Sequence, residues 1–427
     1  MKTSGYYNLN RFGNKLIEGI NAFIFLFALS IGALVLPSML PLTTFLGVLL
    51  LIYGCFFSLV SDFGFTKNIN KLSFIDNINY GNLLIPVIGL LLLLLIYSAK
   101  AFHIKFNFIS GFAALVLHVG FLVFIVNTKK YLLTYIRTYI YFCCFMSFCS
   151  IIAISLLYSG VVDSSSNYIN ISELTGGAFN RDDGSENSYI FPYNLGLILT
   201  GGGKLNLLGF SFFRISGWAH EPTSATLFVA PAIILLLHSK VISKTFYRIS
   251  ALIVIVFFWF FAMSLGSVLA FSILYFMYIL SFLFTKIYPL KFSTILTFSV
   301  MILMLAGVFY FDELLDSSLI ASKIDFSSET FQSAMSRLTF FMPETAITQA
   351  NSFSFIFIYL MMFFFFANIA HSFFIEKEFN PYALVLLYIL IHSMKGSQDS
   401  VFLLTFCFFW FYVLHFSIPN NQTKSVK

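Results

Sequence analysis

The chain has 427 residues, of which 59% are hydrophobic and only 10% are charged. Soluble domains carry about 25% charged residues, so this composition excludes a soluble globular protein and favours a protein that lies within a membrane. The net charge of +6 does not indicate nucleic acid as a partner, because the basic residues are scattered between apolar runs and form no contiguous patch.

Twelve apolar runs have the length that helices need to cross a bilayer, about 20 residues, or come close to it. They fall at roughly 17–36, 43–60, 81–97, 108–126, 138–158, 223–238, 249–264, 267–285, 293–311, 352–373, 381–394 and 400–417. A barrel would show segments of about ten residues with alternating hydrophobicity, whereas these runs are continuous. We therefore predict an all-α polytopic membrane protein with about twelve transmembrane helices, in which residues 1–427 form a single integral membrane domain.

Lysine and arginine residues set the orientation of the predicted helices. With the N-terminus in the cytoplasm and strict alternation, the cytoplasmic side holds about twice as many of these residues as the external side, and acidic residues show the opposite bias. Both termini are therefore expected in the cytoplasm. Lys2, Arg11 and Lys15 precede the first apolar run, and no small-residue cleavage site follows it. We interpret this run as a retained helix rather than a signal peptide.

Two external loops, 159–222 and 312–351, are much longer than most of the others. Long loops in a compact protein are usually functional or disordered. The first one begins with a polar stretch and becomes apolar again in NLLGFSFFRISGWA, residues 206–219. This apolar segment is too short to cross a bilayer, and two interpretations remain open: an interfacial or re-entrant segment, or a loop packed on the helix bundle.

The end of the first long loop carries the most distinctive group of polar residues. Pro222 suits the first position of a helix, which places Glu221 at or beside the N-cap and next to the positive end of the helix dipole. A carboxylate there tends to stay ionised and can accept a proton from a hydroxyl. A simple helix start explains the same pair of residues, but the neighbouring Arg214 and His220 favour a functional role.

Basic residues of the external loops are the candidates for binding an anion. Arg214 lies among Phe and Ile residues, where its guanidinium needs an anion, either an ordinary lipid phosphate or a diphosphate in bidentate contact. Arg337, in the second long loop, would form the other arm of a clamp. Lys395 either joins this site or lies on the solvated surface. Arg181 is expected to pair with a neighbouring aspartate, with anion binding as the alternative.

Neither a metal site nor a disulfide is expected. The five cysteines lie within apolar runs and show no CxxC spacing. His118, His238 and His415 have no carboxylate at metal-ligand spacing, and we interpret each as a hydrogen-bonded packing residue. We therefore predict no metal and no other cofactor.

The whole pattern resembles the bacterial O-antigen and capsule repeat-unit polymerases of the Wzy type. These inner-membrane proteins have many helices, two long periplasmic loops and an R-x-S-G…E-P signature before a helix, which reads here Arg214-Ile-Ser216-Gly217…Glu221-Pro222. A second arginine in the later loop matches Arg337. The resemblance implies a GT-C-like fold in the bacterial inner membrane, with residues 159–222 and 312–351 in the periplasm.

The resemblance also implies a metal-independent glycosyltransferase reaction. A glycan on undecaprenyl diphosphate would be transferred to the non-reducing end of a newly flipped lipid-linked repeat. Arg214 and Arg337 would stabilise the charge on the leaving diphosphate, and Glu221 or His220 would take the proton of the attacking hydroxyl. The expected partners are the lipid-linked oligosaccharide, membrane lipids and, by the same resemblance, a chain-length regulator protein.

Two other functions remain open at this point. An O-antigen ligase shares the fold and the donor, but that family usually carries a histidine in the second long loop, and residues 312–351 contain none. A lipid-linked-oligosaccharide flippase or another transporter would place charged residues within its helices, whereas here the charges gather in the loops. The sequence therefore favours the polymerase.

Overall fold

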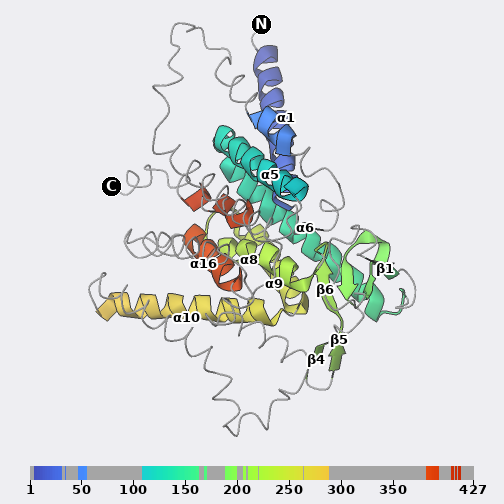
Figure 1. Ribbon diagram of the computed structural model, residues 1–427. Coiled ribbons are helices and arrows are strands. Elements are labelled where there is room, and N and C mark those ends of the chain that lie inside the picture. Colours follow the sequence, from blue (N-terminus) through green and yellow to red (C-terminus); the bar gives the residue numbers. More distant parts are fainter. Residues whose placement is uncertain are drawn as a thin grey trace.

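The computed structural model is shown in Figure 1. It describes residues 4–30, 34, 47–54, 108–162, 168–170, 188–199, 205–207, 210–219, 221–262, 264–287, 381–393, 405–407, 409–410 and 412–414. Most of these residues are helical, which confirms the predicted class in its coarse form.

The helices follow the predicted apolar runs. They are α1 (Ser4–Ser30), α5 (Phe108–Asn127), α6 (Leu132–Tyr158), α8 (Pro222–His238), α9 (Thr245–Ala262), α10 (Leu265–Ile287) and α16 (Pro381–Ser393), together with the 3-10 turn η1 (Lys129–Tyr131) and the helical residues 47–54. α6 begins at Leu132 rather than near residue 138, because polar residues such as Thr134 and Arg137 interrupt its first apolar turns without ending the helix. The runs at 81–97, 293–311 and 352–373 lie outside the described residues.

Two helices of the described part are long and apolar enough to cross a membrane. They are the 30-residue helical segment Lys129–Tyr158 and the 18-residue α9. α8 is equally apolar in character but has only 17 residues. The arrangement of twelve transmembrane helices therefore stays a prediction.

α8 forms the centre of the helical core. Of the residues from Pro222 to Leu236, all but Thr223 are buried. The helix contacts α6, α9, α10 and α16, and Figure 1 shows it between α6 and α16. A helix without a polar face lies in a protein core or in a membrane, and α8 is covered by its neighbouring helices.

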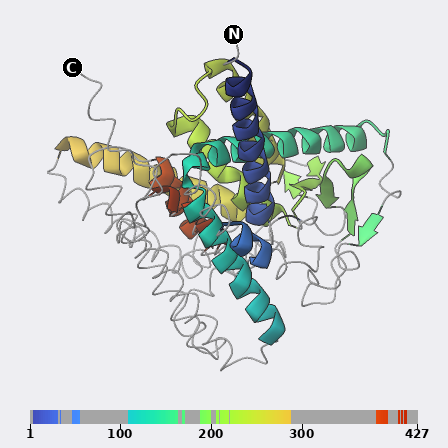
Figure 2. The ribbon, with the colours of Figure 1, turned by 90° about the horizontal axis from the view of Figure 1, so that it is seen from above.

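α1 packs across α6, as the view from above shows (Figure 2). The ring of Phe25 stacks on that of Tyr135, with 4.6 Å between the centroids. Nearer the start of both helices, the hydroxyl of Thr134 donates a hydrogen bond to the carboxylate of Glu18. An aromatic contact and a polar contact thus both fix the position of α1 along α6.

Glycines bring the helical residues 47–54 very close to α5. A Cβ atom on Gly120 would meet the carbonyl oxygen of Gly47, and a Cβ atom on Gly47 would lie 2.6 Å from the backbone nitrogen of Leu117. On Gly54, a Cβ atom would lie 3.0 Å from the Cα of Phe124. Close approach through small residues is typical of helix pairs in membranes.

Short strands occupy the described part of the first long loop. They are β1 (Tyr168–Asn170), β2 (Ser188–Ile190), β3 (Leu197–Leu199), β4 (Leu205–Leu207), β5 (Phe210–Phe212) and β6 (Arg214–Gly217), with the 3-10 turn η2 (Pro192–Asn194) before β3. β1, β2, β3 and β6 form an antiparallel sheet in that order, and β4 pairs with β5. The all-α prediction is incomplete here, because strands of three or four residues are too short to show a two-residue period.

Residues 214–219, the last part of the segment 206–219, pack on the helix bundle. β6 contacts α6, α8 and α9, and Ile215, Ser216 and Gly217 are buried. An isolated antiparallel bridge joins Ala219 to Leu34, just beyond the end of α1. For residues 214–219, the structure agrees with the packed loop, whereas for residues 206–212 both interpretations stay predictions.

Candidate functional site

The segment from β6 to the start of α8 holds the two predicted site residues that the structure describes. β6 lies at one edge of the four-stranded sheet, where Arg214 is in register with Leu199 of β3. The chain then passes through the bridge at Ala219 and enters α8 at Pro222. Arg214 and Glu221 therefore lie at opposite ends of one short, well-packed segment.

Arg214 lies at the C-terminal end of α9. Its Nε atom donates a hydrogen bond to the carbonyl oxygen of Ala262, the last residue of α9, over 3.4 Å. The last carbonyl groups of a helix lack intrahelical donors and carry partial negative charge, so the cation stabilises this helix end. The contact also holds the half-buried guanidinium in one place.

Glu221 is the N-cap residue of α8, as the sequence predicted. Its backbone is extended, with φ −136° and ψ 148°, and Pro222 occupies the first helical position. The side chain makes no capping hydrogen bond and is half-buried. An N-cap side chain normally accepts a backbone N–H of the first turn, so the helix start alone does not account for the carboxylate.

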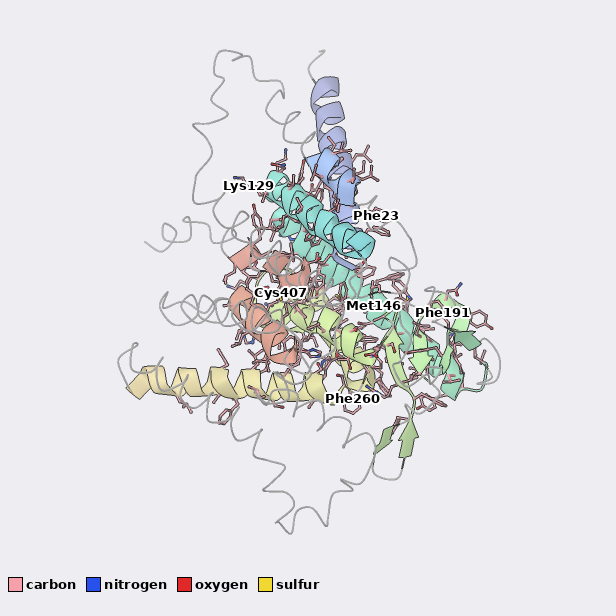
Figure 3. All side chains as sticks on the ribbon, in the orientation of Figure 1. Phe23, Lys129, Met146, Phe191, Phe260 and Cys407 are labelled. Carbon is pink, nitrogen blue, oxygen red and sulfur yellow. The ribbon has the colours of Figure 1, made fainter. Side chains whose placement is uncertain are left out.

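α6 shows how far β6 extends along the bundle. Near the last residue of α6, the backbone N–H of Phe213 donates to the hydroxyl of Tyr158 over 3.0 Å. Further along β6, a Cβ atom on Gly217 would lie 3.2 Å from the Sδ of Met146, in the middle of α6 (Figure 3). The four residues of β6 therefore lie along the C-terminal half of α6.

After β6, the chain continues along α6. The ring of Trp218 lies 5.7 Å from that of Phe142 and 5.8 Å from that of Phe145. Both phenylalanines lie near the middle of α6. Between Phe213 and Trp218, the chain thus runs from the end of α6 towards its middle. Glu221 follows Trp218 by three positions, at the start of α8.

A buried hydrogen-bonded network lies close to the contact of Arg214. Trp259, one turn before Ala262, donates from Nε1 to the Oγ of Ser267 over 2.7 Å. The same Oγ shares a hydrogen bond of 2.6 Å with the hydroxyl of Tyr388. The ring of His392, one turn further along α16, lies 5.6 Å from that of Tyr388. These contacts join α9, α10 and α16, and no local motif predicts them because the residues are far apart in the sequence.

The other predicted site residues are Arg181, His220, Arg337 and Lys395, and all of them lie outside the described residues. The two-arginine clamp, the contribution of Lys395 and the choice between Glu221 and His220 as the base therefore stay predictions. Lys395 follows the described end of α16 by two positions, close in sequence to His392.

His238 and four cysteines can be compared with the predictions made for them. His238 is hydrogen-bonded through Nε2 to the hydroxyl of Tyr275 over 3.0 Å, which confirms the interpretation of this histidine. The thiols of Cys143, Cys144, Cys149 and Cys407 are free, and most of them are buried. Within the described ranges, no group of three His, Cys, Asp or Glu side chains could hold a metal ion.

The chain matches no protein-family model, no curated protein and no solved structure. Its candidate site therefore has to be interpreted from its own geometry.

Proposed function

We propose that the chain is a polytopic protein of the bacterial inner membrane with about twelve transmembrane helices and both termini in the cytoplasm. We further propose that it polymerises undecaprenyl-diphosphate-linked repeat units into O-antigen or capsular polysaccharide at the periplasmic face. The proposal combines the apolar composition, the charge bias of the loops and the placement of Arg214 and Glu221.

The surface of the described helices supports a membrane location. On α6, Tyr141, Phe145 and Phe148 follow one another at helical spacing, and each is more than half exposed. On α9, large apolar residues such as Ile253 and Phe260 are exposed in the same way. Soluble monomers rarely expose contiguous apolar patches of this kind. Beyond Phe148 the exposed residues include Ser155 of α6 and Ser159, which follows the helix, as expected where a helix leaves the hydrocarbon.

The observation that carries the proposed chemistry is the segment 214–222. It holds a cation against the end of α9 and a carboxylate at the start of α8 that does not cap the helix. A glycosyl transfer from a lipid diphosphate needs both groups, because negative charge develops on the leaving diphosphate while the attacking hydroxyl loses a proton.

In the proposed reaction, a sugar hydroxyl of the acceptor repeat forms a bond to the anomeric carbon of the donor glycan. The bond between that carbon and the diphosphate oxygen breaks, and undecaprenyl diphosphate leaves with the electron pair. Glu221, with His220 as the alternative, takes the proton of the hydroxyl. Arg214 and Arg337 stabilise the charge on the diphosphate, and Lys395 and Arg181 are further candidates for this contact.

Deletion of the gene in its host tests the function directly. Loss of a polymerase leaves single repeats attached to the lipid A core, because export and ligation continue. Loss of a ligase leaves the core bare while lipid-linked polymer accumulates, and loss of a flippase leaves the core bare without any polymer. Where the product is O-antigen, only the first outcome agrees with the proposal. Purified protein supplied with a defined lipid-linked repeat should then lengthen it.

A further inference from the structure

Arg214 lies beside the start of a second helix as well as beside the end of α9. Only residues 263 and 264 separate Ala262, whose carbonyl accepts the hydrogen bond of Arg214, from α10. The carbonyl of Ser264 accepts the backbone N–H of Val268 over 3.0 Å. This is the first intrahelical bond of α10, so Ser264 occupies the N-cap position.

The start of α10 is not capped by its own serine. The Oγ of Ser264 has no hydrogen-bond partner, although the residue is only 1% exposed. A serine at this position normally accepts a backbone N–H of the first turn. The N–H groups of residues 265–267 have no intrahelical carbonyl to bind, and α10 has 23 residues whose dipoles add at this end.

A second buried hydroxyl lies on the strand of Arg214. The register between β3 and β6 shifts here, because Ile198 is opposite Ile215 and Leu197 is opposite Gly217, so Ser216 is the extra residue of a bulge. Its Oγ also has no hydrogen-bond partner, and the residue is fully buried. Buried polar groups in proteins are hydrogen-bonded in the large majority of cases. One of these hydroxyls lies two residues from Arg214 in the chain, and the other lies two residues from Ala262, which Arg214 binds. Together they indicate a group that a ligand supplies.

We propose that the start of α10, the hydroxyls of Ser264 and Ser216, and the guanidinium of Arg214 form a binding site for a phosphate or diphosphate group. Backbone N–H groups at a helix start bind phosphate oxygens, and a guanidinium binds them in a bidentate manner. Gly266 has no side chain that would shield the first turn. Given the proposed function, the ligand is the diphosphate of the lipid-linked donor.

Binding of inorganic diphosphate to the full-length protein in phosphatidylcholine nanodiscs tests the site by calorimetry. Ser264→Asp is the informative variant, because aspartate is a good N-cap residue and preserves the helix, whereas its charge repels an anion. We expect at least tenfold weaker binding than in the wild type. Ser155→Asp adds the same charge on an exposed part of α6 and should change the affinity less than twofold. Equal affinities of the wild type and Ser264→Asp, or no binding by the wild type, would overturn the site.

Two further measurements distinguish the source of the phosphate. If the site takes ordinary lipid headgroups, replacing phosphatidylcholine with phosphatidylglycerol weakens diphosphate binding to the wild type but not to Ser264→Asp. If it takes the donor, undecaprenyl diphosphate competes and phosphatidylglycerol does not. Either result supports a phosphate site.

The polymerisation assay separates the site from the proposed function. Diphosphate binding that is lost in Ser264→Asp supports the site even where the wild-type protein fails to lengthen a lipid-linked repeat, and in that case only the function is wrong. Ser264→Asp that polymerises at the wild-type rate excludes the donor diphosphate as the ligand of this site and leaves the function standing.

Discussion

The hydroxyl of Tyr139 on α6 donates a hydrogen bond to the backbone carbonyl of Phe228 on α8. Phe228 lies three positions before Pro231, which has no N–H and interrupts the hydrogen-bond ladder of α8. The carbonyl that loses its donor to Pro231 is that of Leu227, four positions earlier. Tyr139 binds the neighbouring carbonyl at the centre of the core, and its ring also lies 5.4 Å from that of Phe228.

Tyr139→Phe should therefore destabilise the protein by about 1 kcal/mol, because it removes the hydrogen bond and keeps the ring. Thermal unfolding in detergent measures the change. Tyr141→Phe is a matched control, since Tyr141 is exposed on the same helix. This variant should unfold at the same temperature as the wild type. Equal melting temperatures for all three proteins would show that the hydrogen bond from Tyr139 to the carbonyl of Phe228 does not contribute to stability.

Gly120→Leu should prevent the close contact between residues 47–54 and α5, because the new side chain meets the backbone of Gly47. Overpacking of this kind costs about 1–3 kcal/mol or more, and we expect a low yield of monodisperse protein in size-exclusion chromatography. Gly19→Leu makes the same substitution on α1, where nothing lies within 4 Å of an added Cβ. Its yield should match the wild type. A normal yield for Gly120→Leu would contradict the helix pairing.

Arg214→Ala should lower the rate of polymerisation by about 10²–10³-fold, as expected for the loss of one group that stabilises a leaving anion. Arg214→Lys should recover only part of the rate, because a point charge cannot make the bidentate contact. The rate per folded protein is the quantity to measure.

Arg137 offers a matched control for the structural role of Arg214. Its Nε donates to the carbonyl oxygen of Val241 over 3.1 Å, so it too is an arginine on a backbone carbonyl, near the N-terminal end of α6. Arg137→Ala should lose a similar contact and retain its activity. If Arg137→Ala and Arg214→Ala lose activity to the same extent, the effect is one of stability, and the diphosphate is held elsewhere.

Glu221→Gln should leave the melting temperature unchanged, because the carboxylate makes no capping hydrogen bond, and should lower the polymerisation rate by about 10²–10⁴-fold through loss of the base. Binding of the donor should persist. His220→Ala should be milder. Should Glu221→Gln polymerise normally while His220→Ala is inactive, His220 is the base. Activity in both variants would leave Glu221 and Pro222 as a simple helix start.

Reporter fusions test the proposed topology. Fusions near residues 170 and 330 should report a periplasmic location, and a fusion at the C-terminus should report the cytoplasm. The charge bias of the loops is the physical reason, since lysine and arginine are retained on the cytoplasmic side. A cytoplasmic signal from either long loop would contradict both the topology and the proposed reaction.

The sequence by itself determined the helices and the start of α8. Long apolar runs satisfy their backbone only as helices, and Pro222 at the first helical position fixes Glu221 at the N-cap, because both effects act within one turn of the chain. The strands of the first long loop could not be predicted, because their three or four residues are held by pairing with distant segments rather than by a local period.

Only the tertiary structure decided the surroundings of the candidate site. The contact of Arg214 with Ala262, the network of Trp259, Ser267 and Tyr388, and the buried hydroxyl of Ser264 all arise where separate elements meet. A residue's own sequence neighbours carry no information on these partners. The sequence therefore shows that Arg214 and Glu221 occur seven positions apart. The packing of β6 against α9 shows that Arg214 lies beside the uncapped start of α10.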